Sequence, residues 1–206
     1  LTGLTTSSSD AITVVTTDTS IAAANLIAVN LLTSVQIDAT AMTTISGTFA
    51  DVYAVVVTAD TATTINTDED YAATLSDTSI AASDLTLIDS DTSGTVTATA
   101  AGTITGTAAE IITAIQSTGI TTATDYAVTI SGSSSVAQLT AIDSDTSGTI
   151  TAADITDTYG NIKTLAANSP TSLQNATGTI TANGTFQAET IDMSDIGALA
   201  NLSIKA

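Results

Sequence analysis

The chain has 206 residues, with 21 acidic residues against two basic ones, no His, no Cys and a net charge of −19. Nucleic acid is excluded as a partner because binding to phosphates needs clustered Lys or Arg, and disulfides and thiolate metal sites are excluded by the lack of Cys. Apolar residues make up 43% of the chain, more than a disordered protein carries. No apolar run approaches the ~18 residues that span a bilayer, so we expect a folded protein that does not insert into a membrane.

Two kinds of segment alternate along the chain. Strands are predicted where β-branched or apolar residues alternate with small polar ones, in residues 12–16, 71–76, 95–105, 126–131 and 177–182. Helices are predicted where apolar residues recur at helical spacing, in 79–91 with Ser79 as N-cap, in 106–118 with Thr107 as N-cap, and in 157–170, where Pro170 ends the helix. A short helix between successive strands implies that these strands are parallel.

The chain also repeats itself. Residues 79–111 align without a gap on residues 20–52, IDSDTSGT occurs at 88–95 and at 142–149, and DYA occurs at 70–72 and at 125–127. The repeat is about 54 to 59 residues long, and each repeat holds two strand–helix rungs of roughly 27 residues. The internal repeats fall at approximately 10–69, 70–124, 125–175 and 176–206.

Stacked repeats of this kind predict the fold. We expect residues 1–206 to form a single α/β repeat solenoid with a parallel sheet, short helices and about seven rungs. The alternative is an all-β solenoid or β-helix, in which the Ala-rich segments are turns and strands.

Four stretches carry a resemblance: SDTSIAASDL, LTLIDSDTSGTV, TITGTAAEIITAI and DYAVTISG. They resemble the tandem repeats of very large secreted or cell-surface proteins of marine bacteria, cyanobacteria especially. The resemblance implies an extracellular structural or adhesive role and supplies no catalytic residues. The composition agrees that the chain is not an enzyme, because without His, Cys or Arg no known spacing selects a catalytic set among the remaining polar residues.

One segment, residues 143–154, also resembles the twelve-residue calcium loops of EF-hand and dockerin modules. That resemblance implies that Asp143, Asp145, Ser147 and Asp154 offer side-chain oxygens to calcium and that Thr149 offers its carbonyl oxygen. The final Asp is shorter than the Glu of most EF-hands, as it is in dockerins.

A second copy of this loop, residues 88–100, weakens the calcium interpretation, and we call it the sister loop. It retains Asp89, Asp91 and Ser93 but has Ala100 at the last ligand place. The alternative is a turn from helix to strand, in which Gly148 adopts the left-handed conformation and a strand begins near Thr149.

Rows of Thr two residues apart form a further pattern. These side chains are predicted to project from one sheet face, and they are Thr95, Thr97 and Thr99, then Thr103, Thr105 and Thr107, and later Thr177, Thr179 and Thr181. Flat Thr rows organise water in ice-binding solenoids, whereas elsewhere Thr simply fills solvent-facing strand positions.

The ends of the chain bear on assembly. Residues 12–16 and 202–206 both read as strands without a polar cap. An uncapped solenoid continues into further repeats or stacks head to tail on another copy. We therefore expect a noncatalytic extracellular structural protein, with a calcium-dependent adhesin or an ice-binding solenoid as alternatives, and the residues identify no glycan or surface ligand.

Overall fold

The computed structural model describes residues 10–168, 177–183 and 202–204. The chain divides into two compact units. Unit 1 comprises Leu1–Thr78, Asp84–Ala101 and Thr118–Thr122, and unit 2 comprises Ser79–Ser83, Gly102–Ser117 and Ala123–Ala206. Every strand pair among the described residues is parallel, and the helices are short. The predicted α/β class with parallel strands is therefore confirmed.

Unit 1 contains a five-stranded sheet and a two-stranded sheet. The larger sheet has the order β1-β3-β5-β7-β9, formed by Ser20–Ala22, Thr44–Gly47, Ala72–Leu75, Val96–Ala98 and Ile120–Thr122. The smaller sheet pairs β2 (Ile37–Asp38) with β4 (Ile65–Asn66). The helical elements are α1 (Ala23–Asn30), α2 (Phe49–Tyr53), the π-helix η1 (Ala54–Ala59) and most of α3 (Ala82–Asp91).

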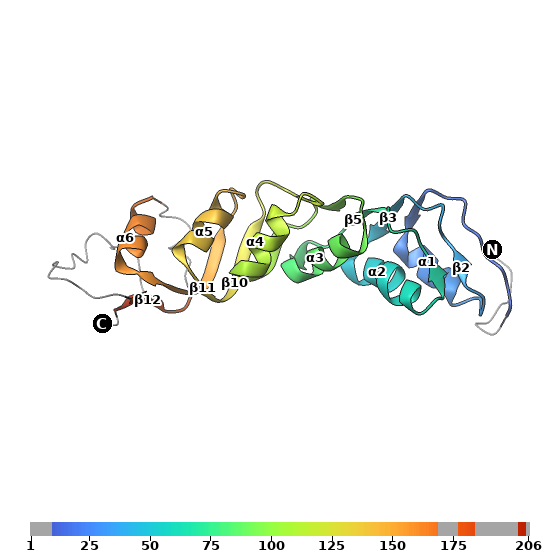
Figure 1. The fold of residues 1–206 in the computed structure, drawn as a ribbon, viewed down its shortest axis with the longest axis horizontal. Helices are drawn as coiled ribbons and strands as arrows, with labels where there is room; N and C mark the ends of the chain where they lie inside the picture. The colour runs from blue at the N-terminus through green and yellow to red at the C-terminus, as the bar shows by residue number, and fades with distance from the viewer. Residues whose placement is uncertain (1–9, 169–176, 184–201, 205–206) are drawn as a thin grey trace. The chain divides into compact units, whose positions relative to one another are not determined.

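Unit 2 contains a six-stranded sheet with the order β13-β12-β11-β10-β8-β6. In chain order the strands β6, β8, β10, β11, β12 and β13 are Ser79–Ala81, Thr103–Thr107, Ala127–Ser134, Ile150–Thr158, Ile180–Asn183 and Leu202–Ile204. Helices α5 (Val136–Asp143) and α6 (Tyr159–Asn168) lie between successive strands of this sheet, and α4 (Ala108–Gln116) follows β8 (Figure 1). Helix α4 contacts α5, and α5 contacts α6.

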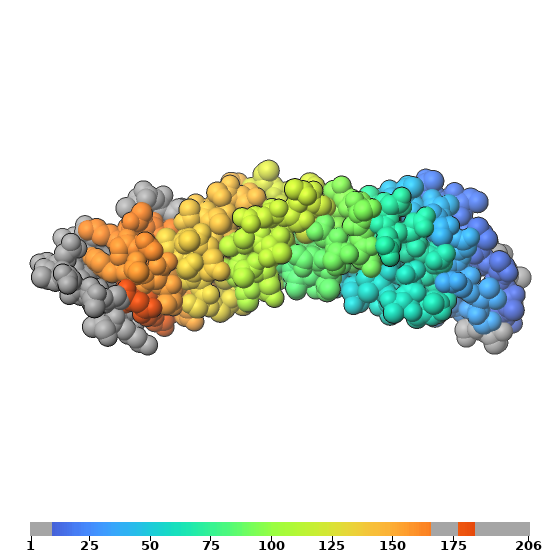
Figure 2. All heavy atoms as spheres, viewed as in Figure 1, coloured from blue at the N-terminus to red at the C-terminus, as the bar shows by residue number. Residues whose placement is uncertain are grey.

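The parallel register lines up apolar residues from strand to strand. Ile80, Ile104, Val128 and Ile150 form one such row in unit 2, and all four are buried. The equivalent row in unit 1 is Ile21, Ile45, Ala73, Val96 and Ile120. Burying one large aliphatic side chain contributes about 1.5–3 kcal/mol. Each strand thus covers the apolar residue of its neighbour. Within each unit, successive parts of the chain form adjacent bands in Figure 2.

Three predicted elements differ from the structure. Within residues 12–16 only Val15 pairs, in an isolated bridge to Asp38. The predicted helix 79–91 begins with strand β6, because Ser79–Ala81 pairs with β8, so Ser79 is not a helix cap. The predicted strand 95–105 is divided into β7 and β8, because a turn closed by the Ala101 amide and the Ala98 carbonyl interrupts it.

Two helix predictions agree with the structure. Thr107 caps α4: its hydroxyl accepts a hydrogen bond from the Glu110 amide, and the Glu110 carboxylate accepts one from the Thr107 amide. Helix α6 lies inside the predicted range 157–170, whereas Pro170 lies outside the described residues.

Candidate functional site

The two repeated motifs, DYA and DTSG, meet in the structure. We call the contact in unit 1 the first clasp, formed by Tyr71, Asp91, Thr92, Ser93 and Gly94. The Tyr71 hydroxyl donates to Asp91 Oδ2 at 2.6 Å, and Thr92 Oγ1 donates to the carbonyl oxygen of Tyr71. The Gly94 amide donates to Thr92 Oγ1 at 3.0 Å, and the Ser93 amide donates to the carbonyl oxygen of Glu69 at 2.8 Å. The turn after α3 is thus bound to the chain just before β5.

The second clasp has the same bonds in unit 2, and its residues are Tyr126, Asp145, Thr146, Ser147 and Gly148. The Tyr126 hydroxyl donates to Asp145 Oδ2 at 2.6 Å, and Thr146 Oγ1 donates to the Tyr126 carbonyl oxygen at 2.6 Å. The Gly148 amide donates to Thr146 Oγ1 at 3.0 Å, and the Ser147 amide donates to the Thr124 carbonyl oxygen at 2.9 Å. Here the turn after α5 is bound to the chain just before β10.

Each residue type in a clasp has a physical reason. The Thr hydroxyl is both donor and acceptor, so one atom joins the two chain segments and also orders the turn. Glycine is needed because a Cβ at Gly94 or Gly148 would overlap the carbonyl oxygen of Tyr71 or Tyr126. Both tyrosine rings are buried. Burial, followed by the hydrogen bond to the partner aspartate, raises the pKa of each tyrosine hydroxyl, which stays a protonated donor.

A related contact occurs in the first repeat, between the turn after α1 and the residues near Ile12. Thr33 Oγ1 donates to the Ile12 carbonyl oxygen at 2.6 Å, and the Val35 amide donates to Thr33 Oγ1 at 3.0 Å. The Ser34 amide donates to the Asp10 carbonyl oxygen at 2.9 Å. This copy retains the Thr-Ser pair and lacks the Tyr, the Asp and the Gly. That Thr-Ser pair, shared with 92–93 and 146–147, was the signal that could have revealed it.

The predicted calcium ligands are engaged elsewhere. Asp145 accepts from Tyr126, and the Thr149 carbonyl oxygen accepts from the Val128 amide at 2.8 Å. Ser147 Oγ donates to the Thr124 carbonyl oxygen at 3.2 Å. Asp154 lies within β11, where its Oδ1 accepts from the Thr179 amide at 2.7 Å. Asp143 is the last residue of α5.

In the sister loop, too, the predicted calcium ligands have contacts within the protein. Asp91 accepts from Tyr71, and Ser93 Oγ donates to the Glu69 carbonyl oxygen at 3.3 Å. The Asp89 carboxylate lies against the backbone of Gly119. Across residues 10–168, 177–183 and 202–204, no group of three or more His, Cys, Asp or Glu is placed to hold a metal ion.

The turn interpretation of this segment is correct in part. A strand does begin close to Thr149, since β11 starts at Ile150. However, Gly148 is not in the left-handed region, and Ser144, the C-cap of α5, has a right-handed conformation. Glycine is required at 148 by the close approach of the Tyr126 carbonyl, not by a positive φ.

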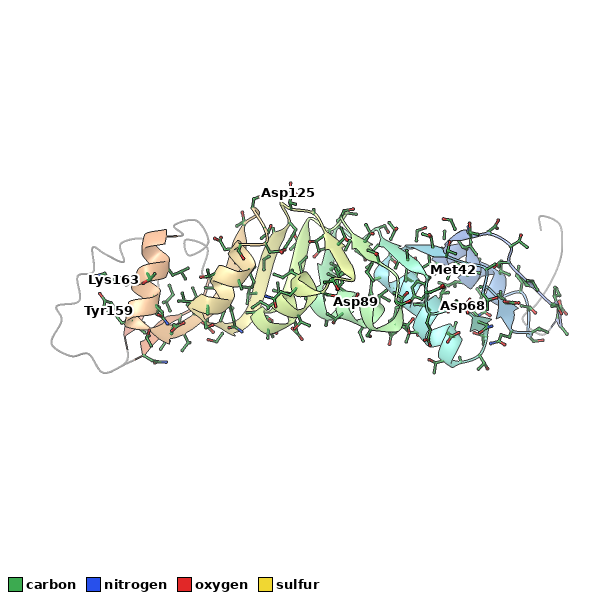
Figure 3. The ribbon with its side chains drawn as sticks, turned by 45° about the horizontal axis from the view of Figure 1, so that its top comes forward. Met42, Asp68, Asp89, Asp125, Tyr159 and Lys163 are labelled. Carbon is green, nitrogen blue, oxygen red and sulfur yellow. The ribbon has the colours of Figure 1, made fainter. Side chains whose placement is uncertain are left out.

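An acidic hollow lies beside the first clasp. Its volume is about 520 Å³, and it is lined by Asp68, Glu69, Asp70, Ser90, Asp91, Thr92 and Ser93. At the second clasp the three residues before the tyrosine are Ala123, Thr124 and Asp125. Figure 3 labels Asp68 and Asp125, which belong to the chain preceding β5 and β10 respectively. The two clasps therefore share their bonds but differ in the charge around them.

The predicted Thr rows form only in part. Thr97 is in register with Thr74 and Thr121 in unit 1, and Thr105 is in register with Thr129, which pairs with Thr151, in unit 2. Thr181 is likewise in register with Thr156. The remaining predicted positions are less regular: Thr103 pairs with Ala127, Thr107 caps α4, and Thr95, Thr99, Thr177 and Thr179 lie outside the strands.

Within the parts of the chain that the structure describes, the helices lack the length and apolar character needed to cross a membrane. Comparison with known proteins adds no relative: no protein-family model, curated protein or solved structure matches this chain.

Proposed function

We propose that this chain is a noncatalytic extracellular structural repeat protein, either a segment of a giant surface protein or a subunit of a surface fibre that assembles end to end. One observation carries the proposal: the residues that define the sequence repeat bind the turn after a helix to the residues that precede the neighbouring strand. The Tyr, Asp, Thr and Gly of the repeat make the same bonds in both clasps. Such use of repeated residues is typical of proteins stabilised by contacts between neighbouring repeats.

The proposal includes a solenoid of stacked coils. Its support is that strands pair in chain order, in parallel, at intervals of about 22 to 28 residues within each unit. A single coil would expose its apolar strand residue to water. Ile104, for example, is covered on its two sides by Ile80 and Val128. Stability then depends on neighbours, as in a one-dimensional stack.

End-to-end assembly is supported by the edge strands. β1 and β13 are terminal strands in the order of their sheets, and an edge strand offers unpaired backbone groups to another strand. Neither strand contains an ionisable residue: their sequences are SIA and LSI. In a protein with a net charge of −19, uncharged strands are the places where two copies meet with least repulsion.

The extracellular location rests on the resemblance and on composition. With only two Lys and no Arg, the chain offers trypsin-like proteases almost no cleavage sites, which suits a long-lived exposed protein. The calcium-dependent adhesin and the ice-binding solenoid stay as alternative predictions. The contacts of the loop oxygens and the interrupted Thr rows favour the structural role over both.

Electron microscopy and sedimentation velocity of the purified chain over a range of concentrations test the proposal. We expect filaments or rods that lengthen with concentration. A variant lacking residues 202–206 should associate less, while the control Ala109→Ser, exposed on α4, should associate as the parent does. Compact monomers at every concentration, or unchanged assembly after the deletion, would contradict end-to-end assembly.

A further inference from the structure

The two clasps form a matched pair inside one chain. Their hydrogen bonds are the same, and both join a helix end to the residues before a strand. Any difference between them must come from their surroundings. Thr146 is buried, with 6% of its surface exposed, whereas Thr92 is half-buried beside the acidic hollow.

The charge around the two tyrosines differs sharply. Besides burial and the bond to Asp91, the negative charges of Asp91, Asp60 and Glu69 all raise the pKa of Tyr71. For Tyr126, the pKa is raised by burial and by a single carboxylate, Asp145, through its hydrogen bond and its charge. The hollow brings Asp68 and Asp70 to the same place. No Lys lies among the residues that line it.

This crowding acts directly on the bonds of the first clasp. Glu69 supplies the carbonyl oxygen that holds the Ser93 amide, and its neighbours Asp68 and Asp70 line the same hollow as Asp91. Repulsion between the two chain segments therefore pulls on this bond and on the bond from Thr92 to Tyr71. Such repulsion extends over a Debye length of about 30 Å at 0.01 M salt and about 3 Å at 1 M salt.

We propose that the first clasp is a salt-sensitive contact. Its hydrogen bonds break locally at low ionic strength and form as the salt concentration rises, while those of the second clasp stay formed throughout. The proposal goes beyond the structural role, since it concerns the regulation of one contact and holds whether or not the protein forms filaments. Screening requires no bound ion, so any monovalent salt should close the clasp equally.

Amide hydrogen exchange at pH 7 tests this inference, with Ser93 as the probe and Ser147 as the internal control. We expect exchange at Ser93, relative to Ser147, to slow by at least about fivefold between 10 mM and 1 M NaCl. The direct effect of salt on exchange chemistry has the opposite sign, because a negative surrounding repels hydroxide most strongly at low salt. A slowing therefore reports closure of the clasp.

Two variants separate this explanation from a general effect on folding. Asp68→Asn, Glu69→Gln and Asp70→Asn together should abolish the salt dependence at Ser93 and leave the circular dichroism spectrum unchanged. Ala123→Asp with Thr124→Glu should create the dependence at Ser147. Equal salt responses at Ser93 and Ser147 in the parent chain would overturn the proposal. A response to NaCl but not to choline chloride would also overturn it, since it would indicate a bound ion.

Discussion

Thr146 makes two hydrogen bonds with one buried hydroxyl group. Its Oγ1 donates to Tyr126, accepts from the amide of Gly148, and is buried where an unpaired hydroxyl would cost free energy. The same arrangement at Thr92 and Thr33 shows that the Thr side chain, and not the neighbouring carboxylates, is the element common to all three turns. At the scale of the residue, the acidic motif is thus a hydrogen-bonded turn with carboxylates added to it.

Replacing Gly148 with Ala tests how tightly the second clasp is closed. A Cβ at this position would overlap the carbonyl oxygen of Tyr126 and also approach that of Asp125, so the turn must shift. We expect a loss of about 1–3 kcal/mol in the free energy of unfolding, measured by urea titration. The control is Gly160→Ala in α6, where nothing lies within 4 Å of the added Cβ. Equal stability of the two variants would show that the clasp is not closely packed.

Helices α4 and α5 start in the same way but with different chemistry. Thr107 and Glu110 form the capping box of α4, and Ser135 and Gln138 form that of α5. Hydrogen bonds from the Thr107 amide and hydroxyl lower the pKa of Glu110 below its usual value. Gln138 makes the corresponding bond without a charge, so α5 is a natural control for α4.

This difference predicts a pH dependence limited to α4. A carboxylate whose folded pKa is lowered contributes stability that is present above its unfolded pKa, near 4.5, and is lost as pH falls through the folded pKa. We expect Glu110→Gln to be less stable than the parent at pH 7, with a difference that shrinks as the pH falls from 7 to 3, in urea titrations. Gln138→Glu should introduce the same acid loss at α5. A constant difference between parent and Glu110→Gln from pH 7 to pH 3 would disprove the linkage.

The whole molecule carries a net charge of −19, and the repulsion between its carboxylates opposes folding. The strands of the five-stranded sheet contain no ionisable residue, so the carboxylates of unit 1 lie in helices, in turns and in β2. Self-repulsion destabilises a compact state of this charge and is relieved by screening. Salt should therefore raise the melting temperature of the chain as a whole.

Calcium gives a separate prediction at this scale. Since Asp145, Asp154 and the Thr149 carbonyl already accept hydrogen bonds, we expect the melting temperature in 150 mM NaCl to be the same with 1 mM calcium and with chelator. A ligand present at a thousand times its dissociation constant would add about 4 kcal/mol of stability. A rise of several degrees with calcium, absent in Asp154→Asn, would restore the calcium-loop interpretation.

The sequence by itself determined the class of fold and many of its parts. The alternation of apolar and small residues in 71–76 and 126–131 predicted strands that became β5 and β10, and the Thr107 cap placed the start of α4. These strands and this helix start depend on residues only a few positions apart in the chain, so their pattern can be read from a single sequence. The repeat likewise showed which residues matter, because IDSDTSGT and DYA each occur twice.

Only the tertiary structure decided what those residues do. The bond from Tyr126 to Asp145 spans 19 residues and that from Tyr71 to Asp91 spans 20, so the partners come from segments that are distant in the sequence. Pairing with β8 likewise made Ser79–Ala81 a strand instead of the first turn of a helix. A sequence states which donors and acceptors exist, whereas which of them meet depends on the register between paired strands. For that reason the sequence could not show that Tyr71 and Tyr126 donate to Asp91 and Asp145 in the turns that lead from helix to strand.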